Sequence, residues 1–412
     1  MIVSLTFEHP RRQAQEAWLL AFVDLFAEQR RVLGYTPASM KTSTGLVRDF
    51  VAWLDQRKIE GCSVPNDLVS EYLAERWLHR RRRRGDVFTL RSFVKLCASD
   101  RRMGQAEPPV ATTPAHRVRQ DFERYLRCER GLAEASIRLY GDAVGRFLEH
   151  AFGVEDVRLG ALAATDVVRF VQTEAARLNH AKRAKVMTSA LRSFLRYGRY
   201  HGEIAADLHS CVPTVANWSM TGLPRTISAA QVKSLLASCD RRVPVGRRDY
   251  AMLLLLARLG LRAGEVVELR LEDLDWDEGA IHIRGPAQRC DRLPLPADVG
   301  AALAEYLHEG RPSCSVRNVF VRSRAPRHAL RGPSAVSCVV CRALRRAGID
   351  SPFKGAHLLR HSLATQMLGS GASLGEIGQI LRHRNPQTTT IYAKVDLGSL
   401  HALALPWPGA AQ

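Results

Sequence analysis

The sequence lacks any apolar run long enough to cross a membrane. The longest run, AMLLLLA at 251–257, falls far short of the roughly 18 residues that a spanning helix needs. The N-terminal stretch MIVSLTFEHPRRQ turns polar too early for a secretory signal peptide. We therefore expect no membrane partner and a cytoplasmic location.

Cysteine occurs without the spacing of a disulfide framework or a metal site. The nine cysteines are scattered along the chain, so reduced thiols are the default expectation. The pair Cys338 and Cys341 forms a CxxC, but it lies in a helix-like run with no second pair nearby, which favours buried helix positions over a zinc site. The GxxxxGK[ST] pattern of a nucleotide-binding P-loop is also missing.

Acidic residues are too few to balance the basic ones. Lys and Arg total 60 against 41 Asp and Glu, which leaves a formal net charge of +19. This excess favours a polyanionic partner, nucleic acid first, over a charge that only maintains solubility or an anionic membrane surface. The densest basic run consists of Arg80, Arg81, Arg82, Arg83 and Arg84. Such runs are often only solvated, but we expect this one to contact DNA phosphates, which positions DNA without reading its sequence.

Two stretches rich in proline, glycine and small polar residues, 104–114 and 213–224, divide the chain into three pieces. The pieces 1–103 and 115–212 have helical apolar spacing and resemble each other: the stretch from Leu33 aligns with that from Arg130, and LRSFV at 90–94 aligns with LRSFL at 191–195. A duplicated helical module and two unrelated bundles both remain open.

The third piece, 225–400, combines helices with two short strands, GAIHIRG and DRLPLP, joined by a turn at 285–287. Residues 401–412 form a C-terminal tail. We therefore predict a mainly α fold with a small antiparallel sheet, in which two helical N-terminal pieces precede a mixed α/β domain.

The candidate chemistry lies in this third piece. Arg262 sits at a turn between two helical patterns, of which the second is expected to run over EVVELRLEDL. His357 and Arg360 share one helix face because they are three residues apart. His383 falls in a turn, and Tyr392 follows on a segment that Pro386 is expected to open as a second helix. A zinc site is disfavoured because the glutamate of HExxH is absent and an arginine lies on the same face. Arginines with histidines instead suit a phosphate.

These motifs resemble the catalytic domain of the tyrosine recombinases, the phage integrase family. The resemblance rests on GLRAGE, HLLRH, LRHRNPQTTTIY and the nine-residue step from His383 to Tyr392, and it covers about 225–400. Residues 115–212 resemble the SAM-like core-binding domain of that family, whereas 1–103 have no counterpart in its shortest members.

The resemblance implies a recombinase or integrase that uses neither metal nor nucleotide. Tyr392 would attack a phosphodiester of double-stranded DNA to give a 3'-phosphotyrosyl link and a free 5'-hydroxyl. Arg262 and Arg360 would grip the phosphate, His357 would act as acid and base near the nucleophile, and His383 would donate to a phosphate oxygen. Glu265 would have a supporting role by orienting the arginines. His361 would also have a supporting role.

Further expectations concern the partners of the protein. We expect a synaptic tetramer on DNA, in which sibling recombinases could take part, and association with the nucleoid in the DNA-bound state. The extra N-terminal piece favours an enzyme of a mobile element, active in integration or transposition.

One position departs from the family pattern. Family members carry a lysine in the turn between the two strands, where it would protonate the departing 5'-oxygen, but Pro286 occupies that place here. Arg289 and Arg292 are candidate substitutes, although a guanidinium holds its proton too tightly to transfer it well. The alternative function is therefore a catalytically impaired DNA-binding protein that acts as a regulator or accessory subunit.

Overall fold

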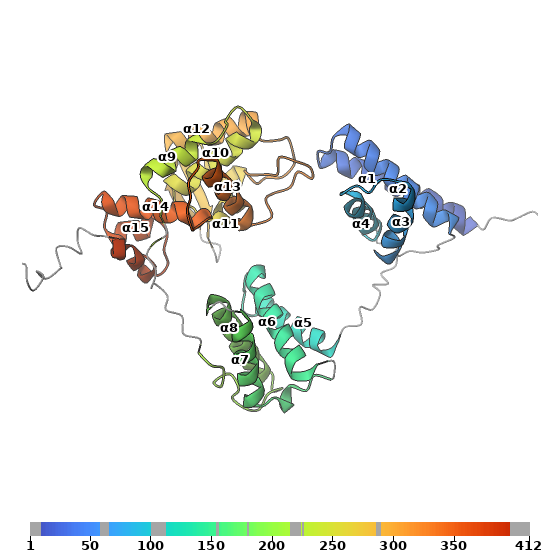
Figure 1. Cartoon of the computed structure of the whole chain (residues 1–412), viewed down its shortest axis with the longest axis horizontal. Helices are drawn as coiled ribbons and strands as arrows, with labels where there is room; N and C mark the ends of the chain where they lie inside the picture. The colour runs from blue at the N-terminus through green and yellow to red at the C-terminus, as the bar shows by residue number, and fades with distance from the viewer. Residues whose placement is uncertain are drawn as a thin grey trace, which may run out of the picture. The chain divides into compact units, whose positions relative to one another are not determined.

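The computed structural model describes residues 10–57, 66–99, 113–153, 156–178, 181–214, 224, 226–285 and 290–395. The chain divides into two units, one of residues 105–221 and the other of 1–104 with 222–412 (Figure 1). The predicted connectors at 104–114 and 213–224 lie mostly outside the described residues, as does the predicted tail at 401–412. None of the described helices is long and apolar enough to span a membrane.

The unit of residues 105–221 is a helical bundle. Its elements are α5 (Pro114–Cys128), α6 (Glu134–Phe152), η1 (Leu159–Ala161), α7 (Ala164–Leu178) and α8 (Ala181–Tyr200). Thr113 caps α5 by accepting the amide of His116 at 3.3 Å, and Pro114 takes the first helical position, where no amide donor is needed. The four long helices each place one phenylalanine in the core: Phe122, Phe147, Phe170 and Phe194.

Residues 10–97 form a second bundle with its own hydrophobic core. Its helices are α1 (Pro10–Val32), α2 (Pro37–Gln56), α3 (Asn66–His79) and α4 (Asp86–Cys97). Each helix contributes at least one aromatic ring to the core, and these rings include Phe26, Phe50, Tyr72 and Phe93.

Residues 226–395 combine helices with a small sheet, which confirms the predicted fold class. The helices are α9 (Ala229–Ala237), α10 (Pro244–Arg258), α11 (Ala263–Glu268), α12 (Ala297–Glu305), α13 (Pro333–Arg346), α14 (Ala356–Gly369) and α15 (Leu374–Ile380), with short turns η2 (Leu271–Asp273), η4 (Tyr306–Gly310), η5 (Pro386–Thr388) and η6 (Thr390–Val395). The strands β1 (Leu274–Asp275), β2 (Ala280–Arg284) and β3 (Cys290–Pro294) are antiparallel in the order β1-β2-β3. Ile281 pairs with Leu274 on one side and with Leu293 on the other.

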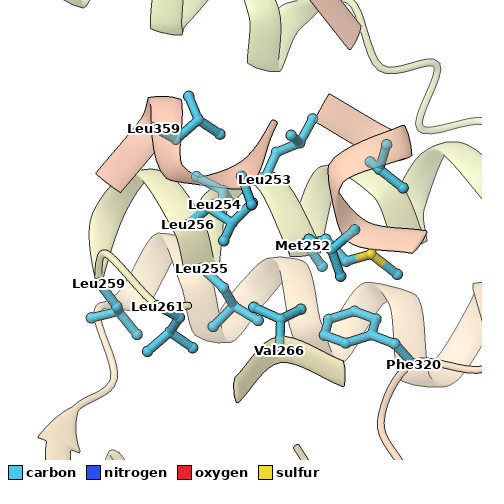
Figure 2. Packing of buried hydrophobic residues seen from close by; sticks show 14 of the residues in the cluster. Met252, Leu253, Leu254, Leu255, Leu256, Leu259, Leu261, Val266, Phe320 and Leu359 are labelled. Atoms are coloured by element: carbon cyan, nitrogen blue, oxygen red, sulfur yellow. The ribbon is translucent and has the colours of Figure 1, made fainter. Parts of the chain in front are cut away.

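Helix α10 is the centre of this core. Its run from Ala251 to Leu256 is buried on every side, which is why the sequence there is apolar without helical alternation. Figure 2 shows Met252 and Leu255 packed among Val266, Phe320 and neighbouring leucines. The end of α10 therefore has a fixed position, and it leads directly into the turn that carries Arg262.

That turn needs a glycine for two reasons. Gly260 has a φ of +57°, a left-handed conformation that favours glycine. In addition, a Cβ at this position would lie 2.6 Å from a methyl carbon of Leu381 and 3.1 Å from one of Leu363. The turn after α10 thus packs directly against Leu363 of α14 and against Leu381, the residue after α15. Three segments that are distant in the sequence are in contact there.

The structure corrects the helix that was expected over EVVELRLEDL. This helix ends at Glu268, because Arg270 forms a bridge with Asn318 and the amide of Leu271 donates to the carbonyl of Arg317 at 2.9 Å. Strand pairing therefore replaces the continued helix.

Two further expectations were wrong in local detail. The segment after Pro386 forms two 3₁₀ turns, η5 and η6, where an α-helix was expected. Asn385 accepts the amide of Gln387 at 3.0 Å, and the β-branched run of three threonines that follows disfavours a longer helix. The CxxC pair lies on α13 as expected, but Cys338 is exposed and Cys341 is only half-buried.

Candidate active site

Arg360 is the structural centre of the candidate site. It lies in the first turns of α14, its residue surface is only 3% exposed, and its guanidinium donates to the carbonyls of Gly260 and Leu381. Burial, followed by the positive charges of Arg262 and Arg382, lowers the pKa of Arg360 to about 10. The side chain therefore remains a cation at neutral pH. Its two hydrogen bonds connect α14 to the turn at Gly260 and to the turn at Leu381.

Arg262 and Glu265 form a second anchor beside it. Arg262 precedes α11, its amide donates to the carboxylate of Glu265 at 2.8 Å, and its Nη1 donates to the other carboxylate oxygen at 2.6 Å. Burial raises the pKa of Glu265, but the bond from the Arg262 amide and the charges of Arg382 and Arg262 outweigh it, so the pKa is lowered. The ionised carboxylate of Glu265 therefore fixes the direction of the Arg262 side chain.

Arg382 belongs to the same cluster, although no motif in the sequence indicates it. Its Nη2 donates to Glu265 at 2.7 Å, and its carbonyl accepts Nη2 of Arg262 at 3.1 Å. The backbone of Arg382 has a φ of +54°, and its Nε is buried without a hydrogen-bond partner among the described residues. An arginine whose backbone is held in this left-handed conformation is a candidate functional residue. The conformation becomes visible only in the folded turn.

Two histidines face the arginines. His383 lies in the turn after α15, and its Nδ1 is 2.8 Å from the hydroxyl of Thr389. Burial, followed by the charges of Arg360 and Arg262, lowers the pKa of His383 to about 4. Partial desolvation and the charges of the same two arginines also lower the pKa of His357, which begins α14 with an exposed side. Both imidazoles are therefore neutral at pH 7 and can each donate one hydrogen bond.

Tyr392 contacts His361. Tyr392 is buried, with 1% of its surface exposed, and its hydroxyl oxygen lies 2.8 Å from Nδ1 of His361. Burial raises the pKa of Tyr392 to about 12, against the opposing charge of Arg360. The histidine that touches the tyrosine is thus the one that the sequence placed in a supporting role, and the ring of His357 lies 6.2 Å from that of His361.

The remaining predicted residues lie elsewhere or outside the described part of the chain. Pro286 and Arg289 fall outside the described residues. Arg292 is on β3, where it pairs with Glu278 at 3.2 Å on the surface. The run Arg80–Arg84 lies between α3 and α4 of the N-terminal bundle.

The arrangement suits a tetrahedral anion. Arg262 and Arg382 both pair with the carboxylate of Glu265, and Nε of Arg382 also lies 3.7 Å from a carboxylate oxygen of Asp291. With the guanidinium of Arg360, three cations stand against two carboxylates, so the cluster retains an excess of positive charge. Arginine forks match phosphate oxygens geometrically, and neutral imidazoles can add single hydrogen bonds. Within the described residues, no group of three or more histidine, cysteine or acidic side chains is placed to hold a metal.

Sequence comparisons agree with this chemistry. The profile described as "Phage integrase family" matches residues 225–398, and that described as "Phage integrase, N-terminal SAM-like domain" matches residues 120–200. A Sinorhizobium fredii protein named as an integrase/recombinase, y4rA, is 46% identical over 389 residues, which cover 94% of each chain. Tyrosine recombinase XerD of Listeria monocytogenes is 30% identical over 67% of this chain and 93% of its own.

Solved structures share the fold. XerH site-specific recombinase bound to palindromic difH substrate aligns with a TM-score of 0.54 and 21% identity over 70% of this chain and 84% of its own. A lambda integrase dimer bound to a COC' core site aligns with a TM-score of 0.50 and 16% identity over 67% of this chain and 94% of its own. The profile matches, the near full-length similarity to y4rA and the similarity to XerD establish that the chain belongs to the phage integrase family of tyrosine recombinases.

Proposed function

We propose that the protein is a site-specific DNA recombinase or integrase that cuts and rejoins strands through a 3'-phosphotyrosyl intermediate on Tyr392. The observation that carries this proposal is the hydrogen bond between the Tyr392 hydroxyl and His361 beside a cluster of three arginines. A phenol whose pKa is raised to about 12 is a poor nucleophile unless a base takes its proton. His361 is positioned to do so.

The reaction follows from this geometry. The Tyr392 oxygen forms a bond to phosphorus, and its proton passes to His361. The bond from phosphorus to the 5'-oxygen breaks, and this oxygen leaves with the bonding electrons and takes a proton from solvent to give the free 5'-hydroxyl. Arg262 and Arg360 stabilise the non-bridging oxygens, and His357 acts as a second acid or base at the phosphate. His383 donates from Nε2 when its Nδ1 accepts the Thr389 hydroxyl. After synapsis, a 5'-hydroxyl of the partner strand attacks the phosphotyrosine and restores Tyr392.

DNA binding must also expose the nucleophile. Tyr392 is buried, and its segment η6 is a short 3₁₀ turn with few internal hydrogen bonds. We expect this segment to shift when a phosphate enters the arginine cluster.

The comparisons support a mobile-element role and an assembly on DNA. Similarity to y4rA extends over 94% of this chain, whereas similarity to the Listeria XerD covers only 67% of it, so the y4rA match includes the additional N-terminal sequence. A lambda integrase tetramer bound to a Holliday junction has the same fold, with a TM-score of 0.50, which supports a synaptic tetramer of this chain or of sibling recombinases. The alternative function is that of an accessory DNA-binding protein. The argument for it is that Pro286 occupies the place of the hairpin lysine.

Tyr392→Phe should bind DNA with wild-type affinity and form no covalent adduct. The measurement is gel detection of protein–DNA adducts on nicked duplexes tiled across the DNA that flanks the coding region. Tyr306→Phe is the matched control, because Tyr306 is equally buried but packs in the core around α10. Adduct formation by Tyr392→Phe would refute the assignment of the nucleophile.

His361→Asn should slow cleavage by about 10²- to 10⁴-fold without weakening DNA binding, since the amide can accept the tyrosine hydrogen bond but cannot hold the proton. The rate of this variant should rise with pH more steeply than that of the wild type, because hydroxide must then remove the proton. His361→Phe, which abolishes the hydrogen bond altogether, should be at least as slow. Wild-type rates and pH dependence in His361→Asn would mean that the histidine has only a structural role.

Arg382→Gly should slow cleavage at least tenfold, and it should be thermally more stable than Arg382→Ala. Both variants remove the guanidinium and its ion pair with Glu265, but only the glycine relieves a left-handed backbone conformation that costs an L-residue about 1–2 kcal/mol. Single-turnover cleavage and thermal melting test the two effects separately. A variant that is more stable and equally active would exclude a role for Arg382 in the site.

Without the hairpin lysine, ordinary DNA should be cleaved slowly and DNA with sulfur at the bridging 5' position much faster. A thiolate leaves without protonation, whereas general acid catalysis is typically worth about 10²- to 10⁴-fold for an oxygen leaving group. Pro286→Lys should accelerate cleavage of ordinary DNA and leave the sulfur substrate nearly unchanged. Equal wild-type rates on both substrates would show that another group supplies the proton, and cleavage of neither would favour the accessory protein.

A further inference from the structure

The described residues of the two bundles form four α-helices each, and corresponding helices begin between 95 and 104 residues apart. The second helices begin at Pro37 and Glu134, which are 97 residues apart, and the third helices begin at Asn66 and Ala164, which are 98 residues apart. The first and fourth helices follow in the same order, as α1 with α5 and α4 with α8. The sequence left duplication and chance similarity open, and this correspondence favours duplication.

The cores of the two bundles repeat the same ring contacts. Between the first and fourth helices, Phe26 and Phe93 are 5.7 Å apart with an interplanar angle of 86°, and Phe122 and Phe194 are 5.3 Å apart at 81°.

The second and third helices repeat a contact in the same way. Phe50 and Tyr72 are 5.1 Å apart, and Phe147 and Phe170 are 5.2 Å apart. Matching aromatic contacts between corresponding helices are not expected of unrelated bundles, so residues 10–97 and 114–200 share one architecture.

A basic corner is repeated at the connection between the third and fourth helices. In the first bundle it consists of Arg80, Arg81, Arg82, Arg83 and Arg84, which are all exposed. In the second bundle, Lys182, Arg183 and Lys185 are exposed in the first turn of α8. The SAM-like family profile matches residues 120–200, within the second bundle.

The corner of the first bundle is held in a defined conformation. The carboxylate of buried Asp86 accepts the amide of Arg83 at 3.1 Å and the indole N–H of Trp77 at 3.3 Å. The guanidinium of Arg82 lies over the Trp77 ring, 4.5 Å from its centroid. These contacts fix the backbone at 82–86 and leave the neighbouring arginines directed to solvent.

No carboxylate among the described residues lies within ion-pair distance of these five arginines. Adjacent guanidinium groups repel each other, and a regularly charged polyanion relieves the repulsion by replacing small counterions. Duplex DNA provides such a row of phosphates. The charge pattern therefore favours a nucleic-acid ligand over a protein surface with a single acidic patch.

We propose that residues 10–97 are a second DNA-binding module of the SAM-like type, which grips the backbone of duplex DNA through Arg80–Arg84. The proposal rests on the proposed function only in taking DNA as the ligand, and it does not depend on the chemistry of Tyr392. The module adds affinity and length to the bound DNA without reading its sequence, because phosphate contacts carry no base information.

The test is the salt dependence of binding by the full-length chain. Replacing all five arginines by serine should lower the slope of log K against log salt by about 0.9 for each phosphate that the protein no longer neutralises, up to about 4.5. Fluorescence anisotropy with a long duplex of arbitrary sequence measures this slope, and Tyr392→Phe as the parent protein keeps covalent chemistry out of the measurement.

The control removes the same number of positive charges from existing surface ion pairs. It carries glutamine in place of five arginines that already pair with carboxylates: Arg31, Arg57, Arg241, Arg242 and Arg317. This variant should change the slope by less than about 0.9, the value for a single phosphate. A five-serine variant with the slope of this control would overturn the proposal.

A photocrosslinking experiment tests the same DNA contact with a single substitution, so it does not depend on a variant that carries five changes. With p-benzoyl-phenylalanine in place of Arg83, irradiation should attach the protein to DNA, whereas the same residue in place of exposed Leu25 should not. A crosslink from position 83 to a second protein chain alone would identify the corner as a protein interface and overturn the proposal. Adduct formation by the wild-type enzyme reports on Tyr392 separately, so failure of either idea can be recognised.

Discussion

The site depends on one buried side chain, the guanidinium of Arg360. By donating to the carbonyls of Gly260 and Leu381, it joins α14 to the turn before α11 and to the end of α15. A buried cation without partners would be strongly destabilising, so the two carbonyls keep these segments together. Arg262 and His383, each two residues beyond one of the two carbonyls, are brought to the same place by this contact.

Charge and burial act together in the cluster. Burial keeps Tyr392 protonated and, with the neighbouring arginines, keeps His383 uncharged, while Glu265 stays ionised among guanidinium groups. The cluster therefore has an excess of positive charge. A DNA phosphate bound there would be stabilised most strongly as its negative charge grows during strand cleavage, which is the arrangement that favours the transition state.

Much of this could be predicted from the sequence, because the informative signals are local. Spacing alone put His357 and Arg360 on α14, and turn residues separated α15 from the segment of Tyr392. The contact between His361 and Tyr392 could not be predicted, because 31 residues of chain and two turns separate them and side-chain packing decides which histidine faces the phenol. The role of Arg382 depends on a positive φ, which no residue pattern indicates. The early end of α11 followed from a bridge to Asn318, a partner 48 residues away from Arg270.

The central claim is that the cluster presents a DNA phosphate to Tyr392. The most direct measurement is mass spectrometry of the tryptic peptide 385–394 from an adduct trapped on a nicked duplex, since Tyr392 is the only tyrosine in that peptide. The account predicts a nucleotide joined through its 3'-phosphate to Tyr392. A nucleotide attached to one of the threonines at 388–390, to another peptide, or through a 5'-phosphate would contradict it.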